Sequence, residues 1–123
     1  MPTELQKAKA KADRYFQKYI RLRDKGKPCI TCGEFRTLEC GHFISRRFES
    51  TRYDEKNAHG QCAKCNRFEY GNQFEHAIQI DNLYGIGTAE SLLMKSKMLS
   101  KRTRIDYERI ANFYKDKCKQ LEK

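Results

Sequence analysis

Cys29-Ile-Thr-Cys32 and Cys62-Ala-Lys-Cys65 are the two stretches of sequence that decide the fold of this chain. Two residues between a pair of thiolates let one tight backbone turn present both sulfurs to a single ion. Two such turns complete a tetrahedral all-cysteine site with no open coordination position. The spacing therefore predicts one structural zinc ion, bound by Cys29, Cys32, Cys62 and Cys65.

The alternative for these cysteines is a disulfide framework, which needs an oxidising compartment and usually a signal peptide. The chain opens with Met1-Pro2-Thr3-Glu4 and continues into Lys- and Ala-rich sequence without the apolar core of a signal. No run is long enough to span a bilayer. A thioredoxin-like redox role would use one pair alone, whereas here there are two. We therefore expect a zinc protein of the reducing cytoplasm with no membrane partner.

Length and composition predict a single domain over residues 1–123 with a small core. Hydrophobic residues make up 38% of the 123 residues and charged residues 34%, so a bound metal should contribute to folding. The 26 basic and 16 acidic residues give a net charge of +10. This balance favours a polyanionic partner, with nucleic acid as the leading candidate.

The first segment, from about residue 3 to 25, has the pattern of an amphipathic helix. Its apolar residues recur at spacings of three and four: Leu5, Ala8, Ala12, Tyr15, Phe16, Tyr19 and Ile20. The other side carries basic residues, which form either a solvated face or a contact with the DNA backbone: Lys7, Lys9, Lys11, Arg14, Lys18 and Arg21. Gly26 and Pro28 should end this helix before the first cysteine pair.

Between Cys29 and about Glu55 the pattern becomes short, alternating and turn-rich. It predicts a zinc knuckle and then a β-hairpin, with a strand over 37–44 and a loop over 45–52. Cys65 should open a helix. A knuckle, a hairpin and a helix around zinc form a treble clef. The predicted class is α+β and mostly helical, with a zinc-bound core (28–85) between an N-terminal helix (1–27) and a C-terminal helical segment (86–123).

Helical patterns continue to the end of the sequence. One helix is predicted over 73–83, Thr88 is a candidate cap for the next, and a break is expected between Ser96 and Lys101. After the break, apolar residues gather on one face that should serve as core or as a dimer surface: Ile105, Ile110, Phe113, Tyr114, Cys118 and Leu121.

Three polar residues carry the chemistry of the predicted core. His42 lies on the predicted hairpin, Asn57 precedes Cys62 by five residues, and Asn66 directly follows Cys65. This order resembles that of the ββα-metal, or HNH, endonucleases, whose zinc-bearing members use a treble clef. The resemblance implies that the hairpin histidine and the helix meet at a divalent ion distinct from the structural zinc.

The chain also resembles the phage NinG (Rap) recombination nucleases from about Cys29 to Gly85. The shared motifs are Cys29-x-x-Cys32, Gly41-His42-Phe43, Arg52-Tyr53-Asp54-Glu55-x-Asn57-x-His59-Gly60-Gln61-Cys62-x-x-Cys65-Asn66 and Gly71-Asn72. This resemblance implies structure-specific cleavage of branched DNA, including Holliday junctions and recombination loops, in phage or prophage recombination. It also implies an enzyme of the bacterial host cytoplasm, associated with the nucleoid. The zinc arrangement looks similar to that of phage endonuclease VII as well.

Phosphodiester hydrolysis gives each of these residues an expected role. His42 would be the general base, because an ordinary pKa of roughly 6.5 leaves it largely neutral at physiological pH. Asn66 would hold Mg²⁺ or Mn²⁺, which acts as a Lewis acid on the phosphate. Asn57 would fix the loop that presents the histidine.

One position departs from the HNH pattern. Many HNH nucleases place an aspartate metal ligand directly before the histidine, and this chain has Gly41 there. The residues left open as replacement ligands are Glu39, Cys40, His59, Glu69 and His42 itself; if His42 is the ligand, another group must be the base. His59 has a structural alternative near the zinc turn, and His76 is expected on a helix surface.

DNA contact is expected from four arginines, because guanidinium groups suit phosphate: Arg46, Arg47, Arg52 and Arg67. The alternative is that some of them pair with Asp54, Glu55 or Glu69. Two symmetric cuts at a junction favour a homodimer, with the C-terminal apolar face as its interface. The other functions considered are a general HNH nicking or double-strand endonuclease, a non-catalytic zinc DNA-binding module, and an adaptor that binds proteins through its terminal helices.

Overall fold

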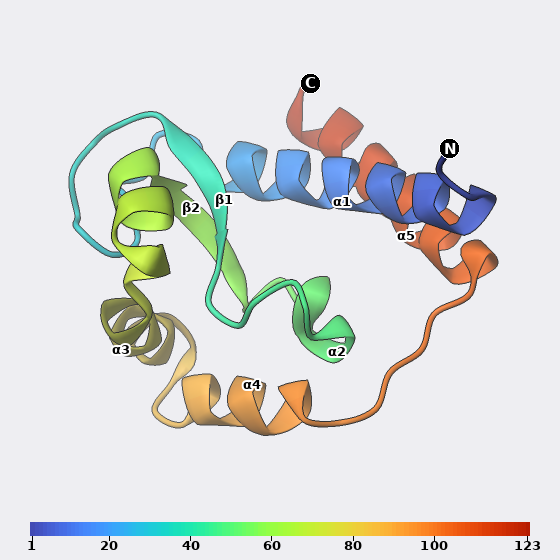
Figure 1. The fold of residues 1–123 in the computed structure, drawn as a ribbon. Helices are drawn as coiled ribbons and strands as arrows, with labels where there is room; N and C mark the ends of the chain where they lie inside the picture. Colours follow the sequence, from blue (N-terminus) through green and yellow to red (C-terminus); the bar gives the residue numbers. More distant parts are fainter.

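The computed structural model describes residues 1–123 as five α-helices and one two-stranded sheet (Figure 1). In chain order the elements are α1 (Glu4–Arg23), β1 (Leu38–His42), α2 (Glu49–Arg52), β2 (Ala58–Cys62), a π-helical turn (Lys64–Phe68), a 3-10 turn (Tyr70–Asn72), α3 (Gln73–Tyr84), α4 (Thr88–Ser96) and α5 (Arg104–Leu121). The predicted helix-rich mixture of α and β structure is confirmed. None of the helices has the length and apolar character needed to cross a membrane.

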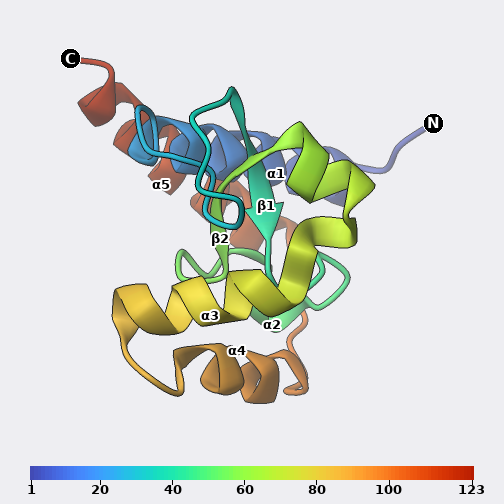
Figure 2. The ribbon, with the colours of Figure 1, turned by 90° about the vertical axis from the view of Figure 1, so that its left-hand side faces the viewer.

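The β1–β2 hairpin lies between two layers of helices, with α1 and α5 on one side and α3 and α4 on the other (Figure 2). Residues of β1 and β2 pair antiparallel, from Leu38 opposite Cys62 to His42 opposite Ala58. Cys40 and Ala58 pack toward α1, whereas His59 contacts His76 of α3. Every residue of β2 is buried, so this strand forms the centre of the molecule.

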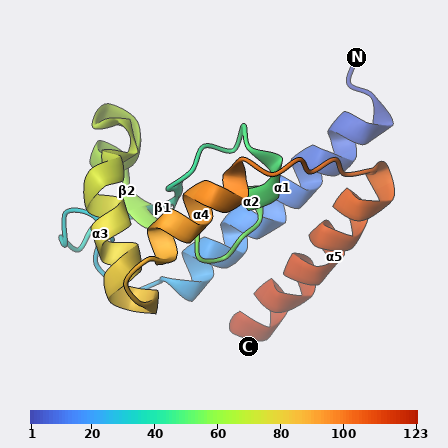
Figure 3. The same cartoon turned by 90° about the horizontal axis from the view of Figure 1, so that it is seen from below.

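Helices α1 and α5 run side by side in the same direction, although they lie at opposite ends of the sequence (Figure 3). The ammonium of Lys9 lies 5.8 Å from the Tyr107 ring centroid near their starts, and Lys18 pairs with Glu122 at 2.8 Å near their ends. Their buried residues form the largest core: Ala8, Ala12, Phe16, Tyr19, Ile20, Tyr107, Ala111, Tyr114 and Cys118. The buried part of the C-terminal apolar face is therefore used within the chain, and the homodimer stays a prediction.

The end of α1 is fastened to the central strand by Asp24. Its carboxylate accepts hydrogen bonds from the Arg23 side chain at 2.8 and 3.0 Å, and from the backbone N–H of Gly60 at 2.7 Å. Arg23 also donates to the backbone oxygens of Glu55 and Ala58. These bonds fix the direction in which α1 meets the hairpin.

Several expected boundaries need correction. The strand predicted over 37–44 is shorter, a short helix forms within the predicted loop, and Cys62 ends a strand that sequence analysis did not locate. Thr88 is not a cap: Gly87 precedes α4 with φ +96°, and the Thr88 hydroxyl donates to the Gly85 oxygen at 2.7 Å. The predicted break is confirmed, since α4 ends at Ser96 and α5 begins at Arg104.

Candidate metal centre and active-site cleft

The four predicted zinc ligands form one cluster. Their sulfur atoms all lie within 4.8 Å of one another, and Cys32 Sγ is 3.8 Å from Cys62 Sγ. A tetrahedral site with Zn–S bonds of about 2.3 Å separates its sulfurs by about 3.8 Å, so the spacing and the donor chemistry both fit zinc. All six cysteines of the chain are free thiols. The cluster can therefore hold a structural zinc ion.

Local hydrogen bonds build the first zinc turn. Gly33 donates to the Cys29 oxygen at 2.9 Å and has φ +76°, a conformation that lets the chain fold back beneath the metal position. Cys29 Sγ accepts the backbone N–H of Cys62 at 3.3 Å. Burial raises the pKa of Cys29, but hydrogen bonds from Cys32, Thr31 and Cys62 outweigh it and leave the pKa at about 6. At Cys29 this favours the thiolate form, whereas burial raises the pKa of Cys32 to about 12 and also raises that of Cys65, so zinc binding would release protons from these two thiols.

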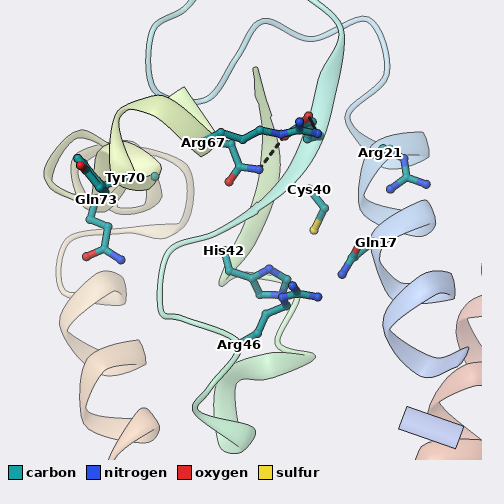
Figure 4. Close-up of a pocket in the computed structure, with 11 residues that line it drawn as sticks. Gln17, Arg21, Cys40, His42, Arg46, Arg67, Tyr70 and Gln73 are labelled. Carbon is teal, nitrogen blue, oxygen red and sulfur yellow. Dashed lines mark hydrogen bonds and ion pairs between the residues drawn. The ribbon is translucent and has the colours of Figure 1, made fainter. Parts of the chain in front are cut away.

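A cleft of about 470 Å³ opens beside β1, between α1 and the turns that precede α3 (Figure 4). Its lining residues are Gln17, Arg21, Glu39, Cys40, His42, Arg46, Asn66, Arg67, Tyr70, Gly71 and Gln73. Three arginines and one carboxylate give the lining a net positive charge, which suits a phosphate backbone. The cleft thus brings together His42 and Asn66, the predicted base and the predicted ligand of the catalytic ion.

His42 is held in one tautomer by the backbone. Its Nε2 lies 3.0 Å from the carbonyl oxygen of Arg52. A carbonyl oxygen can only accept, so Nε2 carries the proton and Nδ1 keeps its lone pair. Nδ1 makes no hydrogen bond within the chain, and burial lowers the pKa of His42 to about 4. The imidazole is therefore neutral at pH 7 and can accept a proton at Nδ1.

Asn57 lies behind the cleft, fully buried. Its Oδ1 accepts the N–H of Ile44 at 2.8 Å, while its Nδ2 donates to the oxygens of Ile44 and Thr51 at 3.1 Å each. These bonds tie the end of β1 to α2. Asn57 thus supports the segment next to His42 without lining the cleft, an arrangement that agrees with a positioning role.

Asn66 and Glu39 both line the cleft, and their side chains are hydrogen-bonded to each other. Asn66 Nδ2 donates to Glu39 Oε1 at 2.9 Å, and Arg67 Nε donates to the same oxygen at 3.0 Å. Burial would raise the pKa of Glu39, but these two hydrogen bonds lower it below its ordinary value. An ionised carboxylate and the amide oxygen of Asn66 are hard oxygen donors of the kind that Mg²⁺ and Mn²⁺ prefer.

Two other candidate ligands of the catalytic ion lie outside the cleft lining. Glu69 is 3.8 Å from the Lys64 ammonium. His59 uses both ring nitrogens within the chain, Nδ1 with His76 Nε2 at 3.1 Å and Nε2 with the Tyr84 hydroxyl at 2.9 Å. Cys40 does line the cleft, but burial raises the pKa of its thiol to about 12 and keeps it protonated. Of the replacement ligands left open, Glu39 is the one whose surroundings suit a hard cation.

The surface position expected for His76 is wrong. Its ring is fully buried between His59 and Phe43, with ring centroids 5.3 and 5.8 Å away. Burial lowers the pKa to about 3 for His76 and about 4 for His59, so both rings are neutral at pH 7. The structural alternative for His59 is the one that its contacts support.

Gly41 has no room for the aspartate that many HNH nucleases place there. A Cβ atom on Gly41 would lie 2.1 Å from Gln61 Oε1 and 2.9 Å from Gln61 Cβ. Gln61 is fully buried, and its Nε2 donates to the Gly71 oxygen at 2.6 Å and to Thr31 Oγ1 at 3.1 Å. Gln61 therefore occupies the space that a side chain at position 41 would need.

We expect Gly41→Ala to lower the free energy of unfolding by about 1–3 kcal/mol, because the added methyl overpacks this site. Urea denaturation of the zinc-loaded protein measures the change. The Gly41→Ala, Gln61→Ala double variant should lose less than the sum of the two single variants, since the two sites share one space. Strict additivity would contradict the overpacking explanation.

The four predicted DNA-binding arginines divide into three groups. Arg46 and Arg67 line the cleft, where the guanidinium of Arg67 pairs with both carboxylate oxygens of Glu39 but, unlike that of Arg52, stays largely exposed. Arg47 lies outside the lining, with its guanidinium 5.2 Å from the Phe48 ring centroid. Arg52 requires a correction: it is largely buried and forms a two-pronged ion pair with Asp13 of α1 at 2.9 and 2.5 Å. Its guanidinium is therefore occupied by Asp13, while its backbone oxygen holds His42.

Asp13→Asn should destabilise the fold by about 3 kcal/mol or more, because it leaves the Arg52 charge largely buried without its partner. Burial alone would raise the pKa of Asp13, but hydrogen bonds from Arg52 and Tyr53 lower it, so the group is ionised at neutral pH. Asp116→Asn on the exposed side of α5 is the matched control and should change stability by about 0.5 kcal/mol or less. Equal urea midpoints for the two variants would contradict a stabilising Asp13–Arg52 pair.

Sequence analysis missed part of the cleft wall. Gln17 and Arg21 lie four residues apart on one face of α1, Tyr70 comes from the 3-10 turn before α3, and Gln73 is the first residue of α3. The sequence places Arg21 on the basic side of the first helix, but it does not predict that Arg21 lines the cleft. The helical spacing shows that Gln17 and Arg21 share a face. It does not show that this face borders β1, which depends on long-range packing.

Comparison with known proteins places the chain among phage proteins. A family model described as "Bacteriophage Lambda NinG protein" matches residues 3–123. The chain is 34% identical over 70 residues to Protein ninG of Escherichia phage 933W, with 54% of this chain and 35% of the relative covered. Protein ninG of Salmonella phage P22 is 31% identical over 77 residues, covering 60% of this chain and 38% of the relative. The chain thus spans little more than a third of these relatives. No solved structure matches.

Proposed function

The chain belongs to the NinG family, and on this premise we propose that it is a divalent-metal-dependent endonuclease that hydrolyses branched DNA, such as Holliday junctions and recombination loops, during phage or prophage recombination. The observation that carries the proposal is the cleft, where a neutral histidine with a free Nδ1, an asparagine next to the zinc cluster and three arginines meet. The knuckle, the hairpin and the turn after Cys65 would then form an HNH-like treble clef. Its place of action would be the host cytoplasm, at the nucleoid.

In the proposed reaction, His42 is the general base. A water oxygen attacks the phosphorus and forms a new P–O bond, while a water proton passes to Nδ1 of His42. The bond from phosphorus to the 3′ oxygen breaks, and this oxygen takes a proton from a second water. The hydroxide left by that water then takes the proton from Nδ1, so His42 returns to its neutral form. The Nε2–H bond to the Arg52 oxygen keeps the ring oriented and stabilises the imidazolium that forms.

Glu39 and Asn66 would hold the catalytic ion through a carboxylate oxygen and an amide oxygen. Mg²⁺ is commonly bound by one or two carboxylates together with substrate phosphate and water, so a small protein ligand set is sufficient. When bound, Mg²⁺ or Mn²⁺ supplies a Lewis acid for the phosphate and the leaving oxygen. Arg67, which bonds to Glu39, would release part of this contact when DNA enters.

Arg21, Arg46 and Arg67 would bind the phosphates that flank the scissile bond. Contacts with the backbone carry no sequence information, which fits an enzyme that selects the shape of DNA. Resolution of a junction needs two cuts, so we include a homodimer in the proposal.

The test is cleavage of a labelled four-way junction and of a linear duplex with the same sequence, with and without Mg²⁺, by zinc-loaded protein. Metal-dependent cutting confined to the junction is the expected result. Equal cutting of both DNAs would indicate a general HNH nuclease instead. Salt-sensitive binding without cutting in Mg²⁺ or Mn²⁺ would leave a zinc DNA-binding module, and absence of binding would favour a protein adaptor.

A further inference from the structure

Three large aromatic side chains stand in solvent within one short segment next to the cleft. Phe68, Tyr70 and Phe74 are 76%, 91% and 82% exposed. Single exposed apolar residues are ordinary, but three exposed rings within seven consecutive residues, beside a candidate functional site, indicate a binding surface. We refer to these three residues as the aromatic ledge.

The backbone at the ledge adopts an unfavourable conformation that presents Tyr70 outward. Tyr70 and Asn72 have φ values of +52° and +48°, in the left-handed region that residues other than glycine seldom adopt. Gly71, between them, has φ +80°. Hydrogen bonds from Gln61 Nε2 to the Gly71 oxygen at 2.6 Å and from Asn72 N to the Glu69 oxygen at 2.8 Å hold this shape. Such strain persists where the surrounding structure fixes it, often at functional sites.

The ledge reaches the basic cleft through Tyr70, whereas Phe68 and Phe74 lie outside the cleft lining. Tyr70 lines the cleft on the side opposite Gln17 and Arg21, with His42 between them (Figure 4). A partner that fills the cleft and reaches the ledge must combine negative charge with flat apolar faces. Single-stranded nucleic acid has this combination, because its phosphates and its unstacked bases are both accessible.

We propose that the aromatic ledge stacks against unpaired bases of DNA whose backbone lies in the cleft, and so selects branched or locally melted DNA over intact duplex. This inference rests on the proposed nuclease function and gives it a source of shape selection. In a continuous duplex the bases are stacked on one another and offer no face to Tyr70. At a branch point or in a bubble they are free to stack on a protein ring.

Fluorescence anisotropy tests the proposal with the full zinc-loaded chain, no added Mg²⁺ and two labelled DNAs of equal length. One is fully paired, and the other contains an internal bubble of unpaired thymines. Tyr70→Ala and Phe74→Ala should each weaken binding to the bubble by about tenfold, while binding to duplex changes by about twofold or less. Tyr70→Phe keeps the ring and should bind the bubble as the native chain does.

Phe35→Ala is the matched control, because this ring is 77% exposed between α1 and β1 and does not line the cleft. It should bind both DNAs normally. Equal weakening on the two DNAs, or no weakening, would overturn the ledge proposal. The proposal would also be overturned if sedimentation showed that the variant had changed its oligomeric state and that this change explained its weaker binding to the bubble. The ledge would then be a contact between copies of the chain. If the native chain binds neither DNA, the nuclease proposal itself fails. If the native chain cleaves junctions, but Tyr70→Ala prefers the bubble over the duplex as strongly as the native chain does, only the ledge proposal fails.

Discussion

Cys62→Ser is expected to unfold the centre of the chain and to abolish stoichiometric zinc binding. Cys62 ends the buried strand β2, and as a zinc ligand it would help to join the knuckle, the hairpin and the turn after Cys65. Structural zinc contributes about 10–16 kcal/mol in small zinc modules, which is comparable with the whole stability of a domain, about 5–15 kcal/mol. Zinc content and thermal unfolding followed by circular dichroism measure the effect.

Cys118→Ser is the control for this experiment. Cys118 is also buried, but its sulfur contacts the backbone oxygen of Tyr15 at 3.7 Å and takes no part in the four-cysteine cluster. This variant should keep one zinc per chain and lose far less stability than Cys62→Ser. Addition of a strong chelator to the native chain should reproduce the Cys62→Ser unfolding. A Cys62→Ser protein that retains zinc and melts like the native chain would contradict the predicted role of the metal.

His42→Ala should reduce single-turnover cleavage by roughly 10²–10⁴-fold, the usual contribution of a positioned general base. Binding of uncleaved junction should change little, because the arginines of the cleft remain. Circular dichroism and zinc content confirm that the variant is folded. Cleavage at a native rate by folded, zinc-loaded His42→Ala would show that another group takes the proton.

The same residue sets the expected pH dependence. In the proposed reaction the active form is neutral His42, which predominates above its folded pKa of about 4 and is lost as the pH falls through that value. Native cleavage should therefore remain nearly constant between pH 7 and about 5, instead of falling near the ordinary histidine pKa of roughly 6.5. Zinc content must be measured at each pH, because acid also protonates the cysteines. A rate that halves near pH 6.5 with zinc retained would contradict a buried, neutral base.

The elements that sequence analysis located correctly depend on local signals. Helix α1 shows its apolar face through residues spaced by three and four, and Thr3 caps it through hydrogen bonds with Gln6. The cysteine cluster follows from the spacing of its ligands. In α1, and within each Cys-x-x-Cys pair, the determining residues lie close together in the sequence; the two pairs are recognised as one site because they share the same ligand spacing.

What sequence analysis missed depends on distant partners. Strand β2 reads Ala-His-Gly-Gln-Cys, which has little intrinsic strand preference; it is a strand because it pairs with β1 and is buried on every side. The sequence predicts Arg52 to be a DNA contact because it does not show that Arg52 has a carboxylate partner. That partner, Asp13, lies in a helix far earlier in the sequence. The burial of His76 depends in the same way on His59 and Phe43, which belong to other elements.

The pairing of α1 with α5 also has a consequence for protein synthesis. At about 5–20 residues per second, a ribosome completes α5 several seconds after α1 has been made. Until then Phe16, which packs against the His42 ring at a centroid distance of 5.9 Å, lacks its α5 neighbour Tyr114. A nascent chain stalled before Arg104 should therefore be cut within α1 by a protease that leaves the 123-residue chain intact, because helix α1 then lacks the packing that α5 provides.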